Sequence, residues 1–319
     1  MSEPGLPIRT VSDAEIRAAR PPRNDLDDQV PYAFFVEPER TAAGNVEDVA
    51  TILVTNRECP FHCLMCDLWK NTTLETVPLG SIPAQIDHAL DRLSPAKHVK
   101  LYNAGSFFDP HAIPPDDYPA IIQRLARFET VIVENHPRFC TERVSRFREK
   151  LGTQLEVAVG LETAHPQVLA ALNKQMTLED FRRAAQFLQE HDVASRTFIL
   201  LRPPYLSEEA GVEWALKSVE AAFDAGTGCC TIIPVREGNG VMEQLRDQGL
   251  FTPPSLHSME RTLQTAVGMG RGRVFVDLWD AKRFAQCPAC ADQRIERLRA
   301  INFTQQIPPR IDCHCGGSP

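Results

Sequence analysis

The chain has 319 residues with 43% hydrophobic and 24% charged side chains, a composition that excludes the disordered and fibrous classes. Its length suits one α/β barrel with appendages. The net charge of −8 excludes a general long-range attraction to nucleic acid or to an anionic membrane surface. Because no apolar run approaches the roughly 18 residues that span a bilayer and no export signal follows Met1, we expect a cytoplasmic protein.

Three regions follow one another along the chain. Residues 1–45 contain Pro21, Pro22, Pro31 and Pro38 among mixed charges and show no sustained period, so we expect an extension that lies over the core. Residues 46–270 are expected to form the core barrel, and residues 271–319 a basic tail. Short apolar or β-branched runs predict seven strands, at 50–55, 97–103, 130–135, 155–161, 196–201, 229–235 and 273–278.

Segments between these runs have the apolar spacing of helices. Thr177 followed by Asp180 predicts a capped helix start, Ser207 opens the next helix, and Gly226 closes it. Alternating strands and helices predict an α/β fold in which right-handed βαβ units curl a parallel sheet into a partial (βα)6 TIM-type barrel. Ligands are expected at the loops that follow the strands.

The loop after the first predicted strand contains three cysteines, Cys59, Cys63 and Cys66. This C-x3-C-x2-C spacing aims three thiolates at one point, and three thiolates on a four-iron cubane leave one iron without a protein ligand. The alternatives are a zinc site, for which a fourth ligand is not evident, and a coincidence of buried thiols. We predict that the three cysteines bind a [4Fe-4S] cluster.

On this loop the chain resembles the radical SAM superfamily, whose signature is this cysteine spacing after the first barrel strand. The resemblance implies that S-adenosylmethionine chelates the open iron. An electron from a donor such as flavodoxin or ferredoxin then causes the cleavage of S-adenosylmethionine. This cleavage gives a 5′-deoxyadenosyl radical, which abstracts hydrogen from a substrate. The family usually has an aromatic residue just before the third cysteine, whereas this chain has Met65, which implies a looser contact with the adenine.

The same resemblance implies cofactor contacts in three later loops. After the second strand come Asn103, Ala104, Gly105 and Ser106, where the family binds the amino group of S-adenosylmethionine, although a plain bend is the alternative. Glu162 would bind the ribose hydroxyls or, alternatively, cap a short helix. Arg202 would pair with the cofactor's carboxylate or, alternatively, form a surface ion pair.

Residues 103–109, 157–174, 200–205 and 249–254 narrow the resemblance to one branch of the superfamily. They are similar to the radical SAM subunit of archaeosine synthase and, more distantly, to the radical domain of the elongator acetyltransferase. The resemblance implies a lysine-modified deazaguanine in transfer RNA as substrate, carbon–nitrogen cleavage as the reaction, and a lysine-transferring partner enzyme. A small metabolite or a peptide is the alternative substrate.

The tail contains four further candidate ligands, Cys287, Cys290, Cys313 and Cys315. Four thiolates that meet tetrahedrally suit a structural Zn²⁺, with His314 as a substitute ligand. A second iron–sulfur cluster and reduced surface cysteines are the alternatives. If zinc were the only metal of the protein, a non-enzymatic interaction protein would be the better interpretation.

Charge is unevenly distributed, because residues 271–319 contain eight basic and five acidic side chains. Arg294, Arg297 and Arg299 lie in a helical segment of this tail. They are expected either to contact RNA phosphates or to form a solvated helix face. The sequence leaves these two interpretations evenly balanced, and only the family resemblance favours RNA.

Overall fold

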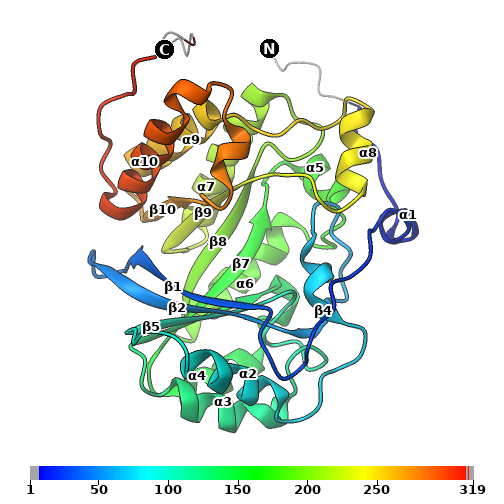
Figure 1. Ribbon diagram of the computed structural model, residues 1–319, viewed down its shortest axis with the longest axis vertical. Helices are drawn as coiled ribbons and strands as arrows, with labels where there is room; N and C mark the ends of the chain where they lie inside the picture. Colours follow the sequence, from blue (N-terminus) through cyan, green and yellow to red (C-terminus); the bar gives the residue numbers. More distant parts are fainter. Residues whose placement is uncertain (1–6, 314, 316–319) are drawn as a thin grey trace.

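A curled eight-stranded sheet forms the centre of the computed structural model, which describes residues 7–313 and residue 315 (Figure 1). Its strand order is β1-β2-β5-β6-β7-β8-β9-β10. Only the β1–β2 pair is antiparallel, and the other pairs are parallel. The strands are β1 (Ala33–Arg40), β2 (Val46–Val54), β5 (His98–Asn103), β6 (Thr130–Asn135), β7 (Gln154–Glu162), β8 (Ala194–Leu201), β9 (Cys229–Pro234) and β10 (Arg273–Val276). The predicted partial barrel is confirmed.

Helices follow the parallel strands and cover the outer face of the sheet (Figure 1). Those on the outer face are α2 (Ser81–Leu90), α3 (Tyr118–Leu125), α4 (Glu142–Leu151), α6 (Leu178–Glu190), α7 (Glu208–Asp224), α9 (Leu256–Gly268) and α10 (Pro288–Thr304), whereas α5 (Pro166–Ala171) and α8 (Val241–Asp247) lie above the strands. Thr177 caps α6 together with Asp180, as predicted. Ser207 caps α7, and Gly226 follows that helix with a φ of +90°. The local start and stop signals therefore set these boundaries.

All seven predicted strands are present, and their ends lie within two residues of the predicted ones except at the start of β2, which begins four residues earlier. The N-terminal segment is more ordered than its composition indicated. It contains α1 (Asp13–Ala18), opened by a Ser12 capping box, and β1, which pairs with β2 from Ala33 to Arg40. Pro38 lies in β1, where an edge strand tolerates a residue that lacks an N–H group.

Two apolar clusters hold the fold together. The larger cluster packs the outward side chains of the sheet against α2, α3, α4, α6, α7, α9 and α10. The smaller one joins α1, α5 and α8 to the loops above the strands, with Ile16, Leu64, Leu172 and Met242 at its centre. Within the residues that the structure describes, no helix combines the length and the apolar character that crossing a bilayer requires.

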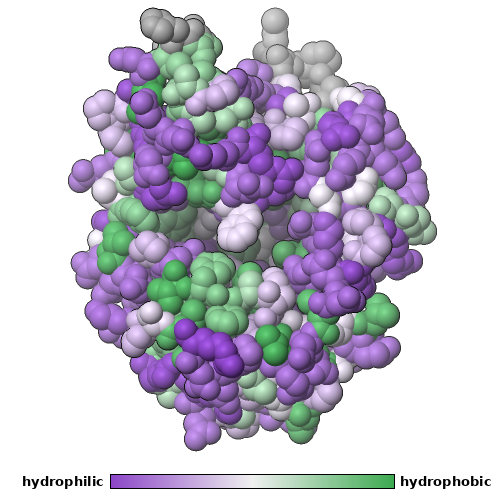
Figure 2. Space-filling model, viewed as in Figure 1, coloured by the Kyte–Doolittle hydropathy of each residue, from purple (hydrophilic) through white to green (hydrophobic). Residues whose placement is uncertain are grey.

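The barrel is open between its two edge strands, and α10 lies across part of that opening. Arg40 at the end of β1 donates to the carbonyl of Phe303 in α10 (2.9 Å) and accepts from Arg273 of β10 at its own carbonyl (3.2 Å). Toward the other end of the strands, Phe35 stacks on Trp279 with 6.3 Å between ring centroids. Figure 2 shows the molecule hollowed between these edges.

Candidate functional site

The three loop cysteines line one large cavity inside the barrel. The cavity has a volume of about 1010 Å³ and reaches from the cysteine loop down to the middle of the strands. The loop is closed at its base by β3 (Asn56–Arg57), which pairs with β4 (Thr72–Thr73). Burial raises the pKa of Cys59, Cys63 and Cys66 to about 12, so the metal-free thiols are protonated at neutral pH. Thiolates here require a bound cation.

The N-terminal segment of residues 7–24, called the strap below, holds the cysteine loop against the barrel. Asp13 contacts the Nδ1 atom of His62 (3.1 Å) and accepts from the Nδ2 atom of Asn173 (2.6 Å). Glu58 accepts from Arg20 (2.6 Å) and from Arg23. His62 therefore contributes to the structure of the loop through its contact with Asp13.

A second polar segment, after β5, lies against the cysteine loop. Asn103 is 1% exposed, and neither polar atom of its amide has a partner among the described residues. A Cβ on Gly105 would lie 3.5 Å from Cys59 Cβ and 3.6 Å from Asn103 Nδ2, so this glycine sits between the loop and that amide. Ala104, Gly105 and Ser106 line the cavity. A buried amide without partners favours a ligand with polar groups at this point.

Glu162 and Lys174 form a buried ion pair on the cavity wall. Glu162 ends β7 with a φ of +67°, next to a register shift relative to β8. Burial lowers the pKa of Lys174, but the charge of Glu162 and its hydrogen bond favour the ammonium form, so that the pKa is raised. The sequence singled out Glu162 and missed Lys174, which follows α5 and has no local pattern to mark it.

Two further residues of the cavity wall were not predicted. Glu134 accepts from the backbone N–H of Asn103 (2.7 Å), and burial raises its pKa to about 8. His136 stacks on Phe61 with 3.9 Å between ring centroids, and burial lowers its pKa to about 3. Glu134 lies near the end of β6 and His136 directly follows this strand. A polar residue at the end of a barrel strand is the sequence signal that could have identified both.

Of the predicted cofactor residues, Arg202 lies apart from this group. Its Nη1 atom donates to the carbonyl of Pro253 (2.8 Å) and to Glu208 (3.1 Å). Arg202 is absent from the described residues that line the cavity, whereas Met65 and Glu162 are present. The structure thus brings the β5 and β7 loops to the cysteines and holds the β8 loop against α7 and α9.

The four tail cysteines converge on one point. All four sulfurs lie within 4.8 Å of one another, and the Cys287–Cys313 and Cys290–Cys315 separations are both 3.8 Å. Tetrahedral zinc with Zn–S bonds of about 2.3 Å requires sulfur–sulfur distances of about 3.8 Å. His314 lies outside the described residues. By contrast, Cys229 and Cys230 are fully buried in β9.

Most basic side chains of the tail pair with carboxylates. Seven of the eight form ion pairs, namely Arg271, Arg273, Lys282, Arg283, Arg294, Arg297 and Arg299. Arg297 is 5% exposed, and both it and Arg294 bind Glu260 of α9. These two arginines fasten α10 to the barrel, which departs from both predicted roles.

The donor set of the cavity fits a [4Fe-4S] cluster with S-adenosylmethionine. Three thiols and the acidic side chain of Glu162 line one cavity, and the unpartnered amide of Asn103 lies next to Gly105 of its wall. A four-iron cluster is larger than a single ion, so its thiolates need not crowd as tightly as the tail cysteines do. The cavity is also large enough for a nucleoside-sized ligand together with part of a substrate.

Three relatives are similar in sequence. Archaeosine synthase subunit beta of Methanosarcina acetivorans is 28% identical over 281 residues, which cover 79% of this chain and 77% of that protein. The subunit of the same name from Thermococcus kodakarensis is 31% identical over 172 residues, 52% of this chain and 53% of that protein. An uncharacterized protein of Methanocaldococcus jannaschii is 23% identical, covering 92% of this chain and 87% of that protein. No family model matches the chain.

Among solved structures, the archaeal Elp3 of Methanocaldococcus infernus, with its N-terminus deleted, has a TM-score of 0.53 and 14% identity. The similarity covers 79% of this chain and 63% of that chain, and it shows a common fold. The relatives with a named activity are subunits of a synthase, which agrees with the prediction of an enzyme. Sequence and fold together confirm that the chain resembles the radical SAM superfamily, in the branch of archaeosine synthase subunit beta.

Proposed function

We propose that this chain is a cytoplasmic radical SAM enzyme in which Cys59, Cys63 and Cys66 hold a [4Fe-4S] cluster. The observations that support it most are that these three thiols line one cavity, and that Gly105 of the cavity wall lies between Cys59 and the buried Asn103 amide, which has no partner among the described residues. When bound, the cluster and S-adenosylmethionine supply a carbon-centred radical that abstracts a hydrogen atom from the substrate.

The protein's own part is to orient the cofactor and to exclude water. Asn103 offers a donor and an acceptor, Gly105 leaves room for close approach, and Ala104, Ser106 and Met65 complete the wall. Glu162 would accept from the ribose hydroxyls, with Lys174 holding its carboxylate in place. Arg202 is left out of this proposal, since its guanidinium is bound elsewhere.

The proposed substrate is a lysine-modified deazaguanine of transfer RNA, cleaved at a carbon–nitrogen bond. The support is the similarity to archaeosine synthase subunit beta over about four fifths of this chain. The word "subunit" in that name also supports a partner protein, here a lysine-transferring enzyme. An electron donor such as flavodoxin or ferredoxin would reduce the cluster.

For the tail we propose one structural zinc ion bound by Cys287, Cys290, Cys313 and Cys315. The two sulfur separations of 3.8 Å support it, because they equal the edge of a tetrahedral zinc–thiolate site. Such a site would fasten the last residues of the chain to the start of α10. Replacing Cys290 by Ser is expected to remove the zinc while iron content stays the same.

The decisive experiment is anaerobic reconstitution with iron and sulfide, followed by dithionite and S-adenosylmethionine. We expect about four irons on the loop cysteines and formation of 5′-deoxyadenosine. Cys63→Ala should abolish the product and leave the far-ultraviolet circular dichroism unchanged. Cys140→Ala is the matched control, because Cys140 is half-buried, outside the cavity lining, and bonded to Asn135. Undiminished product with Cys63→Ala, or protein that holds zinc alone, would contradict the proposal.

A small metabolite or a peptide is the second candidate substrate. The ion pairs of the tail favour it, because seven of eight basic side chains there already have an acidic partner. Product formation with a candidate peptide or metabolite, in the absence of any transfer RNA binding, would support this substrate class instead.

A further inference from the structure

A belt of paired charges crosses the inside of the barrel below the cysteine cavity. It consists of six side chains from β1, β5, β7, β8 and β10, namely Glu37, Glu39, Lys100, Glu156, Arg196 and Arg273. TIM-type barrels normally fill this space with layers of apolar side chains. The belt is therefore unusual for the fold, and the radical chemistry alone does not explain it.

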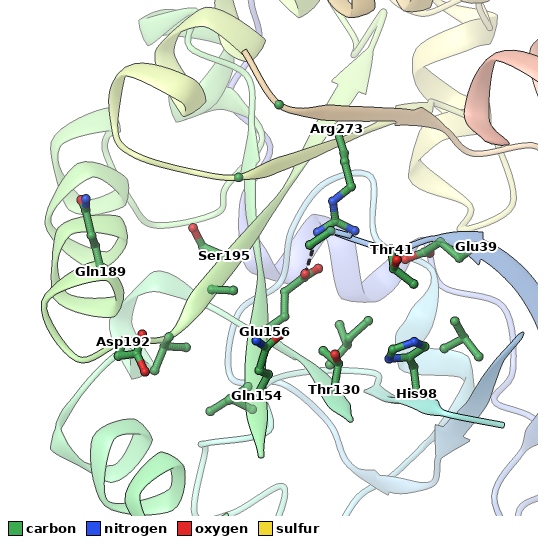
Figure 3. Close-up of a pocket in the computed structure, with 18 of the residues that line it drawn as sticks. Glu39, Thr41, His98, Thr130, Gln154, Glu156, Gln189, Asp192, Ser195 and Arg273 are labelled. Atoms are coloured by element: carbon green, nitrogen blue, oxygen red, sulfur yellow. Dashed lines mark hydrogen bonds and ion pairs between the residues drawn. The ribbon is translucent and has the colours of Figure 1, made fainter. Parts of the chain in front are cut away.

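On the side away from the cysteines, every charged side chain of the belt has an ion-pair partner, and the belt separates two cavities. Arg196 binds both oxygens of Glu39 (2.5 and 3.0 Å) and donates to Glu156 (2.6 Å). Figure 3 shows the ion pair of Arg273 and Glu156, and both residues line a second cavity of about 590 Å³ at the other end of the strands. Although burial opposes ionisation, Arg196 and Lys100 hold the pKa of Glu39 well below its usual range. The belt thus remains charged at neutral pH.

The upper side of the belt faces the cysteine cavity with unused hydrogen-bonding capacity. Glu37 and Lys100 both line that cavity, and the Glu37 side chain is 39% exposed. The Oε1 atom of Glu37 accepts from Lys100 and from Thr51 Oγ1, both at 2.8 Å, and no described residue donates to its Oε2 atom. Lys100 bonds Glu37 and Glu39 and has three N–H donors. One carboxylate acceptor and one ammonium donor remain side by side.

Aromatic rings line the space between the belt and the cysteines. Tyr102 meets Phe198 edge to face with 6.1 Å between centroids, and Phe275 lies two strands from Phe198. Between them Thr231 has a buried hydroxyl without a partner among the described residues. A space with apolar walls that leads from the cysteine loop to a charged floor suits an aliphatic chain with a polar end.

We propose that the belt binds the α-amino acid head of the substrate, with its ammonium on Glu37 and its carboxylate on Lys100. The belt has three acidic and three basic side chains, so it is neutral as a unit. A zwitterion keeps it neutral, whereas a lone cation or anion would leave an uncompensated charge in a buried place. The aliphatic chain would then run between the aromatic rings toward the cysteine loop.

This inference rests on the proposed function for the identity of the substrate, a base that carries lysine. The same zwitterionic head also occurs on a free amino acid. Equilibrium titrations should therefore use two transfer RNAs, one with the lysine-modified deazaguanine and one with the unmodified deazaguanine. Free L-lysine is tested as a competitor beside cadaverine, which lacks the carboxylate, and 6-aminohexanoate, which lacks the α-ammonium group.

The wild-type protein is expected to bind the lysine-bearing RNA more tightly than the bare RNA. Glu37→Gln should weaken binding of the lysine-bearing RNA about tenfold, the loss typical of one charge-assisted hydrogen bond, and leave the bare RNA unchanged. Thr51→Val, which removes the hydroxyl that orients Glu37, should have a smaller effect in the same direction. Glu237→Gln is the matched control, because Glu237 lines the mouth of the same cavity but pairs with Arg246.

Unchanged discrimination in folded Glu37→Gln and Thr51→Val would overturn the inference, as would equal competition by cadaverine, 6-aminohexanoate and L-lysine. A third outcome is that the wild-type protein binds L-lysine specifically, loses this binding in Glu37→Gln, and shows no preference between the two RNAs. This would support the zwitterion site but would show that its ligand is a free amino acid and not the modified RNA. Formation of 5′-deoxyadenosine separates the two proposals. If the Glu37→Gln variant still forms 5′-deoxyadenosine with dithionite and S-adenosylmethionine, any loss of preference for the lysine-bearing RNA concerns the belt alone. If the wild-type protein forms no 5′-deoxyadenosine, the proposed function is refuted.

Discussion

Because Gly160 has no side chain, there is room beside it for the Glu162–Lys174 ion pair. A Cβ on Gly160 would overlap Oε1 of Glu162 and Nζ of Lys174. The glycine therefore provides space for the ion pair on the cavity wall, next to the register shift of β7. Its function is steric, since its φ lies outside the left-handed region.

Gly160→Ala is expected to lower the free energy of unfolding by about 1–3 kcal/mol, because an added methyl group overpacks this site. The measurement is urea denaturation with S-adenosylmethionine absent. Gly268→Ala at the end of α9 is the control, since nothing lies within 4 Å of its added Cβ, and it should stabilise the protein by about 0.5 kcal/mol. Equal stabilities of the two variants would contradict the steric argument.

Glu134 is expected to make stability fall with rising pH. Burial raises its pKa from 4.5 to about 8, so the folded protein holds this proton more tightly than the unfolded chain does. The stabilisation is complete below the unfolded pKa and is lost as the pH rises through the folded one. Glu134→Gln should therefore lose less unfolding free energy between about pH 5 and 8, by at most ~1.4 kcal/mol per pH unit. Parallel pH profiles from urea titrations would refute this.

Among the elements, the segment that contains α1 depends on one carboxylate of the cysteine loop. Glu58 accepts from both Arg20 and Arg23, and its side chain is 17% exposed. Its two arginine partners hold the pKa of Glu58 low although burial opposes this. Gly240 at the start of α8 leaves room for the same segment, because a Cβ there would overlap the carbonyl of Ala19.

Glu58→Ala is expected to cost about 2 kcal/mol of unfolding free energy, since it leaves two half-buried guanidinium groups without their acceptor. Proteolysis within residues 7–24 should accelerate as the strap loosens. Glu142→Ala removes an exposed carboxylate that pairs with Arg146 in α4, and should cost less than about 0.5 kcal/mol. A strap that resists protease equally in both variants would speak against its dependence on Glu58.

For the whole molecule, the net charge and the paired tail limit what electrostatics can contribute to RNA binding. The chain has a charge of −8, and only Arg310 among the eight basic tail residues forms no ion pair with a described residue. Recognition of the proposed transfer RNA substrate would then rely mainly on the base that enters the cavity and on the proposed partner protein, and less on phosphate contacts.

The affinity for transfer RNA is therefore expected to depend weakly on salt. Each phosphate contact adds ~0.7–0.9 to the slope of log affinity against log salt concentration, so we expect a slope no steeper than about −4. Filter binding between about 50 and 200 mM salt measures it. A slope near −7 would mean that the tail's ion pairs open to contact phosphates.

The sequence by itself determined the features that neighbouring residues encode. Alternating apolar runs located all seven predicted strands, and residue spacing identified both cysteine groups, since the four tail sulfurs do converge. Helix caps such as Thr177 were equally local. Apart from the distance between the two halves of the tail cysteine group, these signals lie within short stretches of chain, where the periods of strand and helix geometry are visible.

Only the tertiary structure decided which distant residues meet. The Lys100–Glu37 and Arg196–Glu39 contacts join residues 63 and 157 positions apart, and strand register in the curled sheet determines them. The surroundings of Arg202 have the same origin, because its partners are Glu208 of α7 and Pro253 in the segment before α9. A charged residue in a strand looks the same in sequence whether it faces solvent or the barrel interior. The curling of the sheet decides which face of each strand points inward, and the charged residues on that face form the floor of the cavity.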